Sequence, residues 1–226
     1  MEADPLDLTQ LRTVPLAERV SKVSLDQFAR PPGPARPLEW LETLPKLLAG
    51  NDLRELIEAL ATARARRKPV IAAIGAHVVK CGLTPVLLDL MDRGVVTGIA
   101  TNGATVVHDV EVALVGRTSE DVPRGLREGT FGMAEETHQF ANGAIRDGVA
   151  AGLGLGASIG RALHAAAAPH AEASLFAGAD RRGVPVTVHV AVGTDVLHMH
   201  ATADGAAIGE GSLRDFRSLT AHMAAL

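Results

Sequence analysis

The segment "VVTGIATNGATVVHDVEVALVG" (residues 95–116) contains an apolar run followed by a helical pattern. The run at 95–101 has the length and composition of a buried strand. The pattern "ATVVHDVEVALVG" then predicts a helix that ends at Gly116. A buried strand that leads straight into a helix is typical of α/β proteins, so this segment sets the expected fold class.

The same alternation of strands and helices continues on both sides of this segment. Further buried strands are predicted at 69–75 and 184–192. Apolar strands that alternate with helices indicate a parallel sheet covered on both faces. We therefore expect an α/β fold with a mostly parallel sheet that carries helices on both faces. The predicted helices cover residues 52–67, 84–94, 104–116, 118–129 (opened by Thr118 or Ser119), 131–152, 155–167, 170–183 and 212–226.

The first 50 residues differ from the rest of the chain. They contain seven of the twelve prolines and the only tryptophan, Trp40. We expect an N-terminal arm, with short helices near 7–11, 24–29 and 38–49, that packs across a neighbouring surface with Trp40 as an anchor. A partly ordered tail is the alternative. Residues 51–226 then form a single α/β domain.

Composition excludes several classes of protein. The formal net charge is −4 and only 3% of the residues are aromatic, which argues against a nucleic-acid binder. The single cysteine, Cys81, cannot form an internal disulfide and fits a reducing cytoplasm. No uncharged apolar run reaches the length of a membrane span, and the first 25 residues hold no apolar core of a signal peptide. The sequence therefore predicts a cytoplasmic protein without a membrane or nucleic-acid partner.

Polar side chains gather where each predicted strand ends. The three exits are "IGAHVVKCG" (74–82), "ATNGATVVHD" (100–109) and "AVGTDVLHMH" (191–200). In parallel sheets, ligands bind at the carboxyl ends of the strands, near a switch in strand order. The three exits are therefore expected to meet around one small-molecule site.

The first exit contains a glycine, a histidine and a lysine. Gly75 allows a ligand to approach the backbone closely, and the helix start after it can offer N–H groups to a phosphate. His77 is a candidate for proton exchange, and Lys80 for holding a phosphate or a carboxylate. The alternative is a helix-capping histidine beside a solvated lysine. Cys81 is expected to be a small buried filler, because no histidine–asparagine signature of a thiol nucleophile surrounds it.

The second exit combines a helix start with three titratable side chains. Asn102 lies at the N-cap position, and Gly103 leaves room for a ligand. His108 shares a helix face with Glu111, so the carboxylate can fix the imidazole tautomer of an acid–base pair. Asp109 lies on a different face. The alternative is a histidine satisfied inside a helix bundle, with two exposed carboxylates.

The third exit offers Asp195 and two histidines. His198 and His200 are one residue apart, so on an extended chain they share a face. Together with Asp195 or His189 they can bind a metal ion, which makes a metal-assisted hydrolase an alternative function. No H-E-x-x-H motif or cysteine cluster supports a metal, so no metal ligand is assigned.

The motifs at these exits resemble one superfamily. "GAHVVKCGL", "ATNGATVVHDVEVAL" and "AEASLFAGADRRGVPVTVHVAVGTD" resemble the deoxyhypusine-synthase-like NAD-binding superfamily. "NGATVVHDVEVALVG" also resembles a pattern of NAD-dependent archaeal-type ornithine cyclodeaminases. The resemblance covers about residues 65–216. It implies a doubly wound, Rossmann-like fold for residues 51–226, which would form an NAD-binding catalytic domain. It also implies a homodimer or homotetramer, with NAD bound near the subunit interfaces.

The resemblance also implies roles for residues at the three exits. The first NAD-contacting loop would run past Gly75, His77 and Gly82, and Asp195 would approach the cofactor or the substrate. The expected cofactor-binding residues are Gly75, Gly82, Thr101, Asn102, Gly103, Ala104 and Thr194. The expected catalytic residues are His108, Asp109, Glu111, Asp195, His77 and Lys80.

One departure from the superfamily bears on the chemistry. Deoxyhypusine synthase uses a lysine near its C-terminal end to form a covalent imine, but no lysine follows Lys80 in this chain. The sequence therefore argues against deoxyhypusine synthase activity itself.

The expected function is that of an NAD-dependent enzyme acting on a small amine, amino acid or hydroxyl compound. Hydride would pass to the nicotinamide while His108 takes the proton, and Asp195 would hold the ammonium or hydroxyl group. If the hydride returns to an intermediate, turnover is redox-neutral, so an oxidoreductase, lyase, cyclase or transferase outcome is open. A non-catalytic nucleotide-binding protein is a further alternative.

Overall fold

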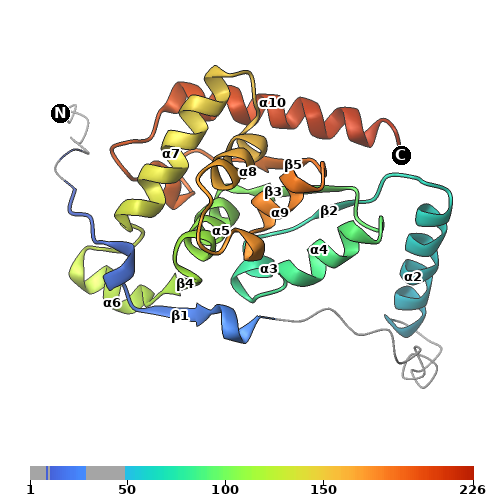
Figure 1. Cartoon of the computed structure of the whole chain (residues 1–226), viewed down its shortest axis with the longest axis horizontal. Helices are drawn as coiled ribbons and strands as arrows, with labels where there is room; N and C mark the ends of the chain where they lie inside the picture. Colours follow the sequence, from blue (N-terminus) through green and yellow to red (C-terminus); the bar gives the residue numbers. More distant parts are fainter. Residues whose placement is uncertain (1–8, 10, 29–48) are drawn as a thin grey trace, which may run out of the picture.

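A parallel sheet of three strands lies at the centre of the part of the chain that the structure describes. The computed structural model describes residues 9, 11–28 and 49–226. β2 (Ile71–Ala73), β3 (Gly98–Asn102) and β5 (Val186–His189) pair in that order and run in the same direction. Figure 1 shows this sheet surrounded by helices. The predicted α/β class and the parallel sheet are confirmed.

The order of the strands differs from that of a doubly wound sheet. A doubly wound sheet grows in both directions, which produces a switch in strand order. Among the described residues, the order β2–β3–β5 follows the chain without a reversal. The predicted doubly wound, Rossmann-like arrangement is therefore not confirmed.

The segment at 95–116 folds largely as its pattern predicts. β3 leads into α5 (Gly103–Val115) with no residue between them. The side chain of Asn102 caps this helix by accepting the N–H of Thr105 at 3.2 Å. The helix ends at Gly116, whose left-handed φ of 66° lets the chain turn away. α5 therefore starts at the carboxyl end of the central strand, where a site is expected.

The other helices pack around β3 and α5 through apolar side chains. One core joins Ile99 of β3 to Val110, Ile145, Leu163 and Phe176 of four helices. None of the described helices is both long and apolar enough to cross a membrane. The helices besides α5 are α2 (Ala49–Ala65), α3 (His77–Lys80), α4 (Thr84–Asp92), α6 (Val122–Glu128), α7 (Glu135–Ala150), α8 (Leu155–Ala165), α9 (Leu175–Arg181) and α10 (Gly205–Met223), with 3-10 turns η4 (Ala171–Ala173) and η5 (Val196–His198).

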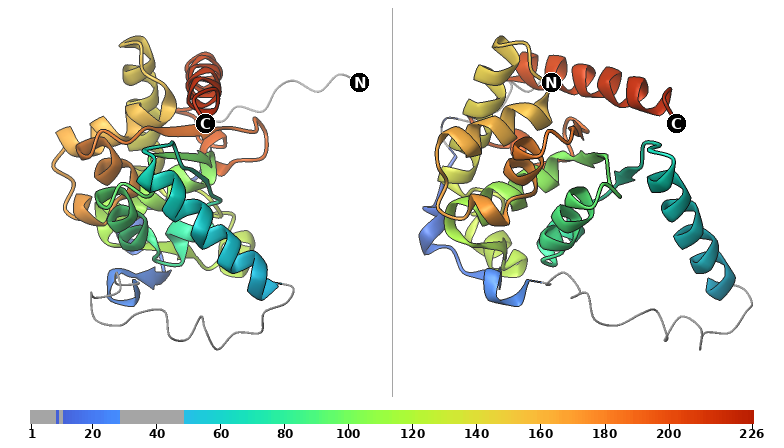
Figure 2. Two further views of the ribbon diagram at one scale, coloured as in Figure 1. Left: turned by 90° about the vertical axis from the view of Figure 1, so that its right-hand side faces the viewer. Right: turned by 45° about the vertical axis from the view of Figure 1, so that its right-hand side comes forward.

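α2 lies outside this core. None of its residues is buried. Figure 2 shows the helix standing to one side of the body. Its C-terminal end is tied to the body by Arg64, whose Nε donates to the carbonyl oxygen of Arg93 at 2.8 Å.

The helix predicted at 118–129 is wrong in its first part. Residues Arg117–Glu120 form strand β4, and α6 begins only after them. β4 pairs antiparallel with β1 (Ser21–Ser24) of the N-terminal arm. Asp121 then caps α6 by accepting the N–H of Arg124 at 3.2 Å. A partner so distant in sequence decides the conformation of this segment, and local spacing gives no sign of it.

The N-terminal arm packs onto the body of the same chain. Besides β1 it contains the 3-10 turns η2 (Leu16–Glu18) and η3 (Leu25–Gln27). Leu16 is fully buried, and its N–H donates to Glu136 Oε2 at 2.6 Å. These contacts hold residues 11–28 against α7 and β4.

The helices predicted in the arm correspond only in part to the structure. The one near 24–29 is the turn η3 in the described residues. Most of the one near 7–11, and residues 38–48 of the third with Trp40, lie outside the described residues.

Two helices cover the outer edge of β5. Asp215 of α10 accepts the N–H of Val188 at 2.7 Å and that of Gly156, in α8, at 3.0 Å. Ser212 accepts the N–H of Val190 at 3.3 Å. Burial raises the pKa of Asp215 to about 6, although the backbone donors act in the opposite direction. N–H groups that a fourth strand would use are thus already taken, which protects this edge from further pairing.

Gly156 sets how closely α8 approaches this strand. A Cβ atom at position 156 would lie 1.8 Å from the carbonyl oxygen of Val186, a backbone atom. Replacing Gly156 with alanine is expected to lower the free energy of unfolding by about 1–3 kcal/mol, because α8 must shift away from β5. Urea denaturation followed by circular dichroism measures the loss.

The matched control is Gly143→Ala in α7. Nothing lies within 4 Å of a Cβ atom there, so this change is expected to be neutral or to stabilise the protein by up to about 1 kcal/mol. Equal stability of the two variants would contradict the close contact of α8 with β5.

Candidate active site

A cavity of about 240 Å³ lies at the carboxyl end of the sheet. All three predicted exits reach it, with Lys80 after β2, His108 in α5 and Asp195 after β5. Ala104, Glu111 and Thr194 line it as well. The remaining polar wall comes from elsewhere in the chain, since Arg19 belongs to the arm and Glu120 to β4. The structure thus brings together most of the residues expected to act on the substrate.

His108 is held by a relay of hydrogen bonds on one face of α5. The Thr118 hydroxyl donates to Glu111 Oε2 at 2.5 Å, so its oxygen is left to accept from His108 Nδ1 at 2.6 Å. This assignment places the imidazole proton on Nδ1 and the lone pair on Nε2. The distance between His108 Nδ1 and Glu111 Oε2 is 3.9 Å, which is too long for a direct hydrogen bond. Glu111 therefore acts on the tautomer of His108 through the Thr118 hydroxyl.

Arg19 holds the other end of this relay. Its Nη1 donates to Glu111 Oε1 at 2.7 Å, and both side chains are at least nine-tenths buried. A second carboxylate, Glu120, lies 4.0 Å from the same nitrogen and accepts the N–H of Gly132 at 2.9 Å. The Glu111 carboxylate is thus bound on one oxygen by a cation and on the other by a hydroxyl.

Burial changes the acid–base properties of two side chains at the cavity. It lowers the pKa of His108, and the cationic neighbours Lys80 and Arg19 act in the same direction, while Glu111 opposes them. His108 is therefore neutral at pH 7 and can accept a proton at Nε2. Burial also raises the pKa of Glu120, while the hydrogen bond from the Gly132 N–H and the positive charge of Arg19 act to lower it. Shifts of this kind are common at catalytic sites.

Ser119, which lines the cavity, has a strained backbone. It lies within β4, yet its φ is 69°, in the left-handed region that non-glycine residues rarely adopt. Such residues concentrate at functional sites, because only the surrounding structure can hold them there.

Asp195 lies directly against the start of α5. A Cβ atom on Gly103 would lie 2.5 Å from Asp195 Oδ2, so only glycine allows this approach. Oδ2 also accepts the N–H of Ala191 at 3.4 Å. The carboxylate benefits from the positive end of the α5 dipole, and it faces the cavity that contains His108.

The side chains predicted to hold a cofactor at β3 are engaged within the protein. Thr101 Oγ1 donates to the Ile74 carbonyl oxygen at 3.0 Å and lies 2.6 Å from Thr105 Oγ1. Asn102 caps α5, and Gly103 is covered by Asp195. Of this group, Ala104 lines the cavity.

The end of β3 does not fit the diphosphate of NAD. Dinucleotide folds place this diphosphate on free N–H groups at a helix N-terminus that follows a strand. At the start of α5, the negative Asp195 carboxylate lies against Gly103, so its charge would repel a phosphate there. Around Gly75, by contrast, the space is open, with no atom within 4 Å of a Cβ position. NAD binding stays a prediction.

The structure places Asp109 away from the cavity. It is fully buried on the opposite side of α5, where it accepts the Ser174 hydroxyl at 2.6 Å and the N–H of Leu175 at 2.6 Å. Phe176 donates a third hydrogen bond, at 3.2 Å. Burial raises the pKa of Asp109 to about 6 despite these donors. Asp109 therefore joins α5 to the N-terminus of α9, and it is a structural residue.

The other predicted residues of the first exit do not line the cavity. His77 and Gly75 are exposed and do not line the cavity. Gly82 is buried with a φ of 78°, and a Cβ atom on it would lie 2.8 Å from the Phe28 Cα of the arm. Cys81 is exposed, so the prediction of a buried filler is wrong.

The histidines of the third exit make separate contacts. His200 Nδ1 lies 2.8 Å from Thr202 Oγ1, and its ring stacks on His138 with centroids 5.3 Å apart. His198 Nδ1 accepts the N–H of Gly193 at 3.4 Å, and His189 Nε2 lies 3.0 Å from Thr187 Oγ1. No group of three possible ligands that could hold a metal ion occurs in the described residues. The alternative of a metal-assisted hydrolase has no support in this arrangement.

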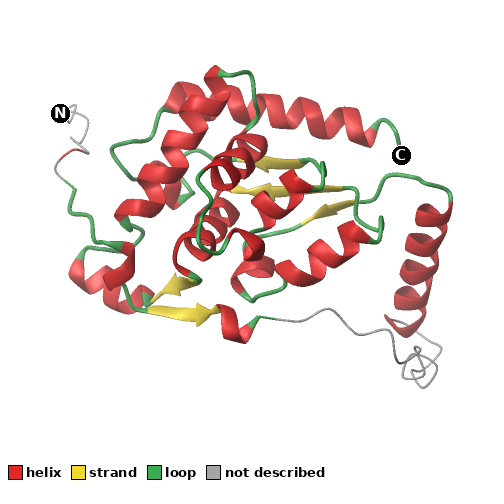
Figure 3. Ribbon diagram, viewed as in Figure 1, coloured by secondary structure: helices red, strands yellow, loops and turns green. Residues whose placement is uncertain are grey.

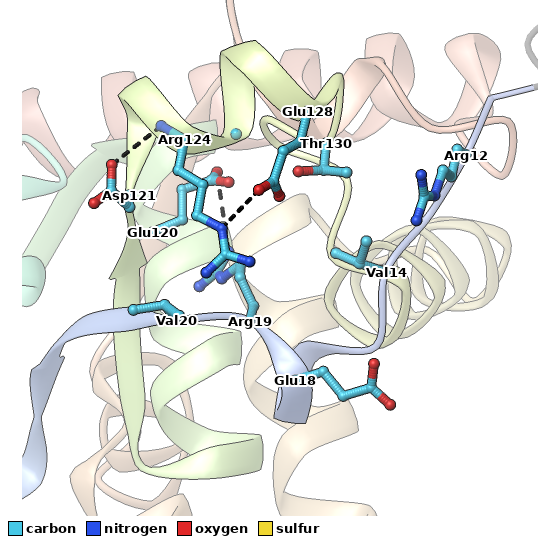
Figure 4. A pocket seen from close by; sticks show the side chains of 11 residues that line it. Arg12, Val14, Glu18, Arg19, Val20, Glu120, Asp121, Arg124, Glu128 and Thr130 are labelled. Carbon is cyan, nitrogen blue, oxygen red and sulfur yellow. Dashed lines mark hydrogen bonds and ion pairs between the residues drawn. The ribbon is translucent and has the colours of Figure 1, made fainter.

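A second cavity of about 270 Å³ shares Arg19 and Glu120 with the first. Figure 4 shows it between the arm and α6, with Arg124 and Glu128 on its wall. Arg124 Nε donates to Glu128 Oε1 at 2.9 Å. Glu120 of this shared wall belongs to β4, which forms the two-stranded ribbon with β1 seen in Figure 3.

Sequence reasoning missed Arg19, Thr118 and Glu120. Arg19 lies in a segment with no helical or strand period, and the other two lie in a segment predicted as helix. The one available signal was that "RTSE", directly after Gly116, can also form a short strand. The helical spacing of the residues that follow favoured a helix instead.

Comparisons with known proteins identify the fold but no family. No protein-family model matches the sequence, and no curated protein does. Among solved structures, the C264A mutant of AgrE in complex with L-arginine matches with a TM-score of 0.50 at 16% identity over 77% of this chain. ArgZ, an arginine dihydrolase from the ornithine–ammonia cycle in cyanobacteria, matches with a TM-score of 0.47 at 13% sequence identity over 78% of this chain. A conserved putative LOR/SDH protein from Methanococcus maripaludis S2 matches with a TM-score of 0.44 at 14% sequence identity over 80% of this chain.

These likenesses extend to only part of each neighbour. This chain spans 23% of the AgrE and ArgZ chains and 51% of the LOR/SDH chain. The AgrE match therefore supports the overall α/β fold alone. None of the three is a deoxyhypusine synthase, so the resemblance to that superfamily stays a prediction.

Proposed function

We propose that this chain is an enzyme that acts on a small polar metabolite carrying an amine, with His108 as the acid–base group. The observation that carries the proposal is the Glu111–Thr118–His108 relay, which leaves Nε2 able to accept a proton beside a cavity. A purely structural histidine needs no such orientation by a buried ion pair.

The charges around the cavity suit a zwitterion. Asp195 and Glu120 can bind an ammonium group, and Lys80 can bind an anion. Val107, Val122, Phe131 and Val196 supply apolar walls. A volume of about 240 Å³ accommodates a compound the size of an amino acid.

In the proposed reaction His108 Nε2 accepts the proton that leaves the amine nitrogen or hydroxyl oxygen of the substrate, and the imidazolium later returns this proton to the product or to water. Glu111, acting through Thr118, stabilises the imidazolium that results, and Asp195 orients the ammonium or hydroxyl group. If NAD binds, it supplies the hydride acceptor. The proposed homo-oligomer adds no residue to this scheme.

A binding and turnover screen tests the proposal. L-arginine, L-ornithine, agmatine and putrescine are tested by calorimetry, and product formation is followed as NADH and as released ammonia, with and without added NAD⁺. L-arginine is included because AgrE was solved with it. Binding of none of these compounds and turnover of none would contradict an amine-directed site.

Replacing His108 with glutamine is expected to lower kcat about 10²- to 10⁴-fold while binding remains. Because burial lowers the pKa of His108 from 6.5, the wild-type rate should fall toward acidic pH with a midpoint below pH 6.5. His164→Gln, at an exposed histidine of α8, is the control and should retain full activity. Full activity of the His108 variant would exclude the acid–base role.

A further inference from the structure

One edge of the Arg19 guanidinium is buried without a hydrogen-bond partner. Nη1 is paired with Glu111, but Nε and Nη2 are buried and contact no acceptor among the described residues. The side chain as a whole is 9% exposed. A buried donor without an acceptor has lost its hydrogen bonds to water with no replacement, so each such group needs an explanation.

These two donors have the geometry of an anion site. Nε–H and one N–H of Nη2 point in the same direction from the planar guanidinium, and such a pair can donate to both oxygens of a carboxylate. Lys80, the other cation of the cavity, has a rotatable ammonium group without this geometry. The free edge of Arg19 is therefore suited to a planar anion with two oxygens.

Arg19 lies where the two cavities meet. It lines the cavity that contains His108 and also the cavity drawn in Figure 4. Arg124 lines the cavity of Figure 4 together with Arg19, and its side chain is 54% exposed. The guanidinium of Arg19 thus borders both cavities, and a ligand in either one lies next to it.

The same carboxylate holds Arg19 and His108. Glu111 Oε1 accepts from Arg19 Nη1, and Oε2 accepts from the Thr118 hydroxyl that orients His108. An anion bound on Arg19 therefore lies within the length of one small molecule from the imidazole.

We propose that Arg19 binds the carboxylate of the substrate through Nε and Nη2. This inference rests on the proposed function and narrows its substrate class to amino acids, as opposed to simple amines. With the carboxylate on Arg19, the ammonium group extends toward Asp195, and the carbon between the two groups lies at His108.

The first test observes Arg19 directly and needs no substrate. The Nε–H resonance of Arg19 in ¹⁵N-labelled protein is followed during titration with sodium acetate and, separately, with inorganic phosphate. A saturable shift with acetate supports the inference. A resonance that responds to neither anion, or to phosphate alone, overturns it.

The second test uses pairs of ligands that differ by one carboxylate. Wild-type protein should bind L-arginine more tightly than agmatine, or L-ornithine more tightly than putrescine, by about ten- to a hundredfold. Arg19→Lys keeps a cation beside Glu111 and thus avoids the folding defect of Arg19→Ala, but it loses the paired donors. This variant should lose the preference and bind the amines unchanged. Arg146→Lys, at an exposed arginine of α7, should retain the preference.

The two tests separate this inference from the proposed function. A wild-type protein without the preference in either pair, or an Arg19→Lys variant that retains it, overturns the carboxylate assignment. Undiminished turnover of His108→Gln instead contradicts the acid–base role, and the acetate response of Arg19 would be unaffected by that result.

Discussion

Glu111→Ala is expected to lower the free energy of unfolding by about 3–5 kcal/mol. The carboxylate is 2% exposed, and the Arg19 guanidinium that it neutralises is 9% exposed. Removing it leaves a buried positive charge without its counter-ion and leaves the Thr118 hydroxyl without its acceptor. Urea denaturation monitored by circular dichroism measures the change.

The control for this experiment is Glu128→Ala. Glu128 also pairs with an arginine, Arg124, at 2.9 Å, but both side chains are about half exposed. A surface pair of this kind contributes about 0–1 kcal/mol, so the control should lose no more than that. If the two variants lost equal stability, the Arg19–Glu111 pair would not be the buried anchor of the arm.

Asp109→Ala is expected to lower the free energy of unfolding by about 2–4 kcal/mol. It removes the acceptor for the Ser174 hydroxyl and for the N–H groups of Leu175 and Phe176, all in the protein interior. The loss of the buried carboxylate, which is costly to desolvate, offsets only part of this.

The effect of this substitution depends on pH in a defined direction. Because the pKa of Asp109 is raised in the folded state, from 3.8 to about 6, the folded protein binds the proton more tightly than the unfolded chain. The stability that Asp109 contributes is therefore largest below about pH 4 and falls as the pH rises to about 6. The loss caused by Asp109→Ala should be roughly 1 kcal/mol larger at pH 5 than at pH 7.

Asp147→Ala serves as the control for this dependence. Asp147 is largely exposed on α7, so its removal should change stability by less than about 0.5 kcal/mol at either pH. A pH-independent effect of Asp109→Ala would contradict the buried, proton-binding carboxylate.

The sequence predicts those parts of the fold that short-range patterns specify. The passage from β3 to α5 follows from an apolar run, an asparagine cap and a terminal glycine within 22 residues. The meeting of Lys80, His108 and Asp195 at one cavity follows from parallel strands alone, because their carboxyl ends share an edge.

Other parts depend on contacts between distant segments. β4 forms because β1 pairs with it, and the sheet stops at β5 among the described residues because Asp215 and Ser212 bind its outer N–H groups. Asp109 and Glu111 lie two residues apart in α5. Asp109 binds the N-terminus of α9, whereas Glu111 binds Arg19 of the arm, so the packing of two distant segments decides their different roles. Spacing along a helix cannot separate these two roles.

The position of Arg19 links ligand affinity to the population of a docked arm. The arm is held by the β1–β4 ribbon, by buried Leu16 and by the Glu111 pair, and a two-stranded ribbon is marginally stable alone. A molecule whose arm has come off lacks Arg19 in its site, so the measured dissociation constant equals the intrinsic one divided by the docked fraction. Substitutions at Leu16 therefore weaken binding without touching the ligand, and a ligand held by Arg19 protects the arm from proteolysis.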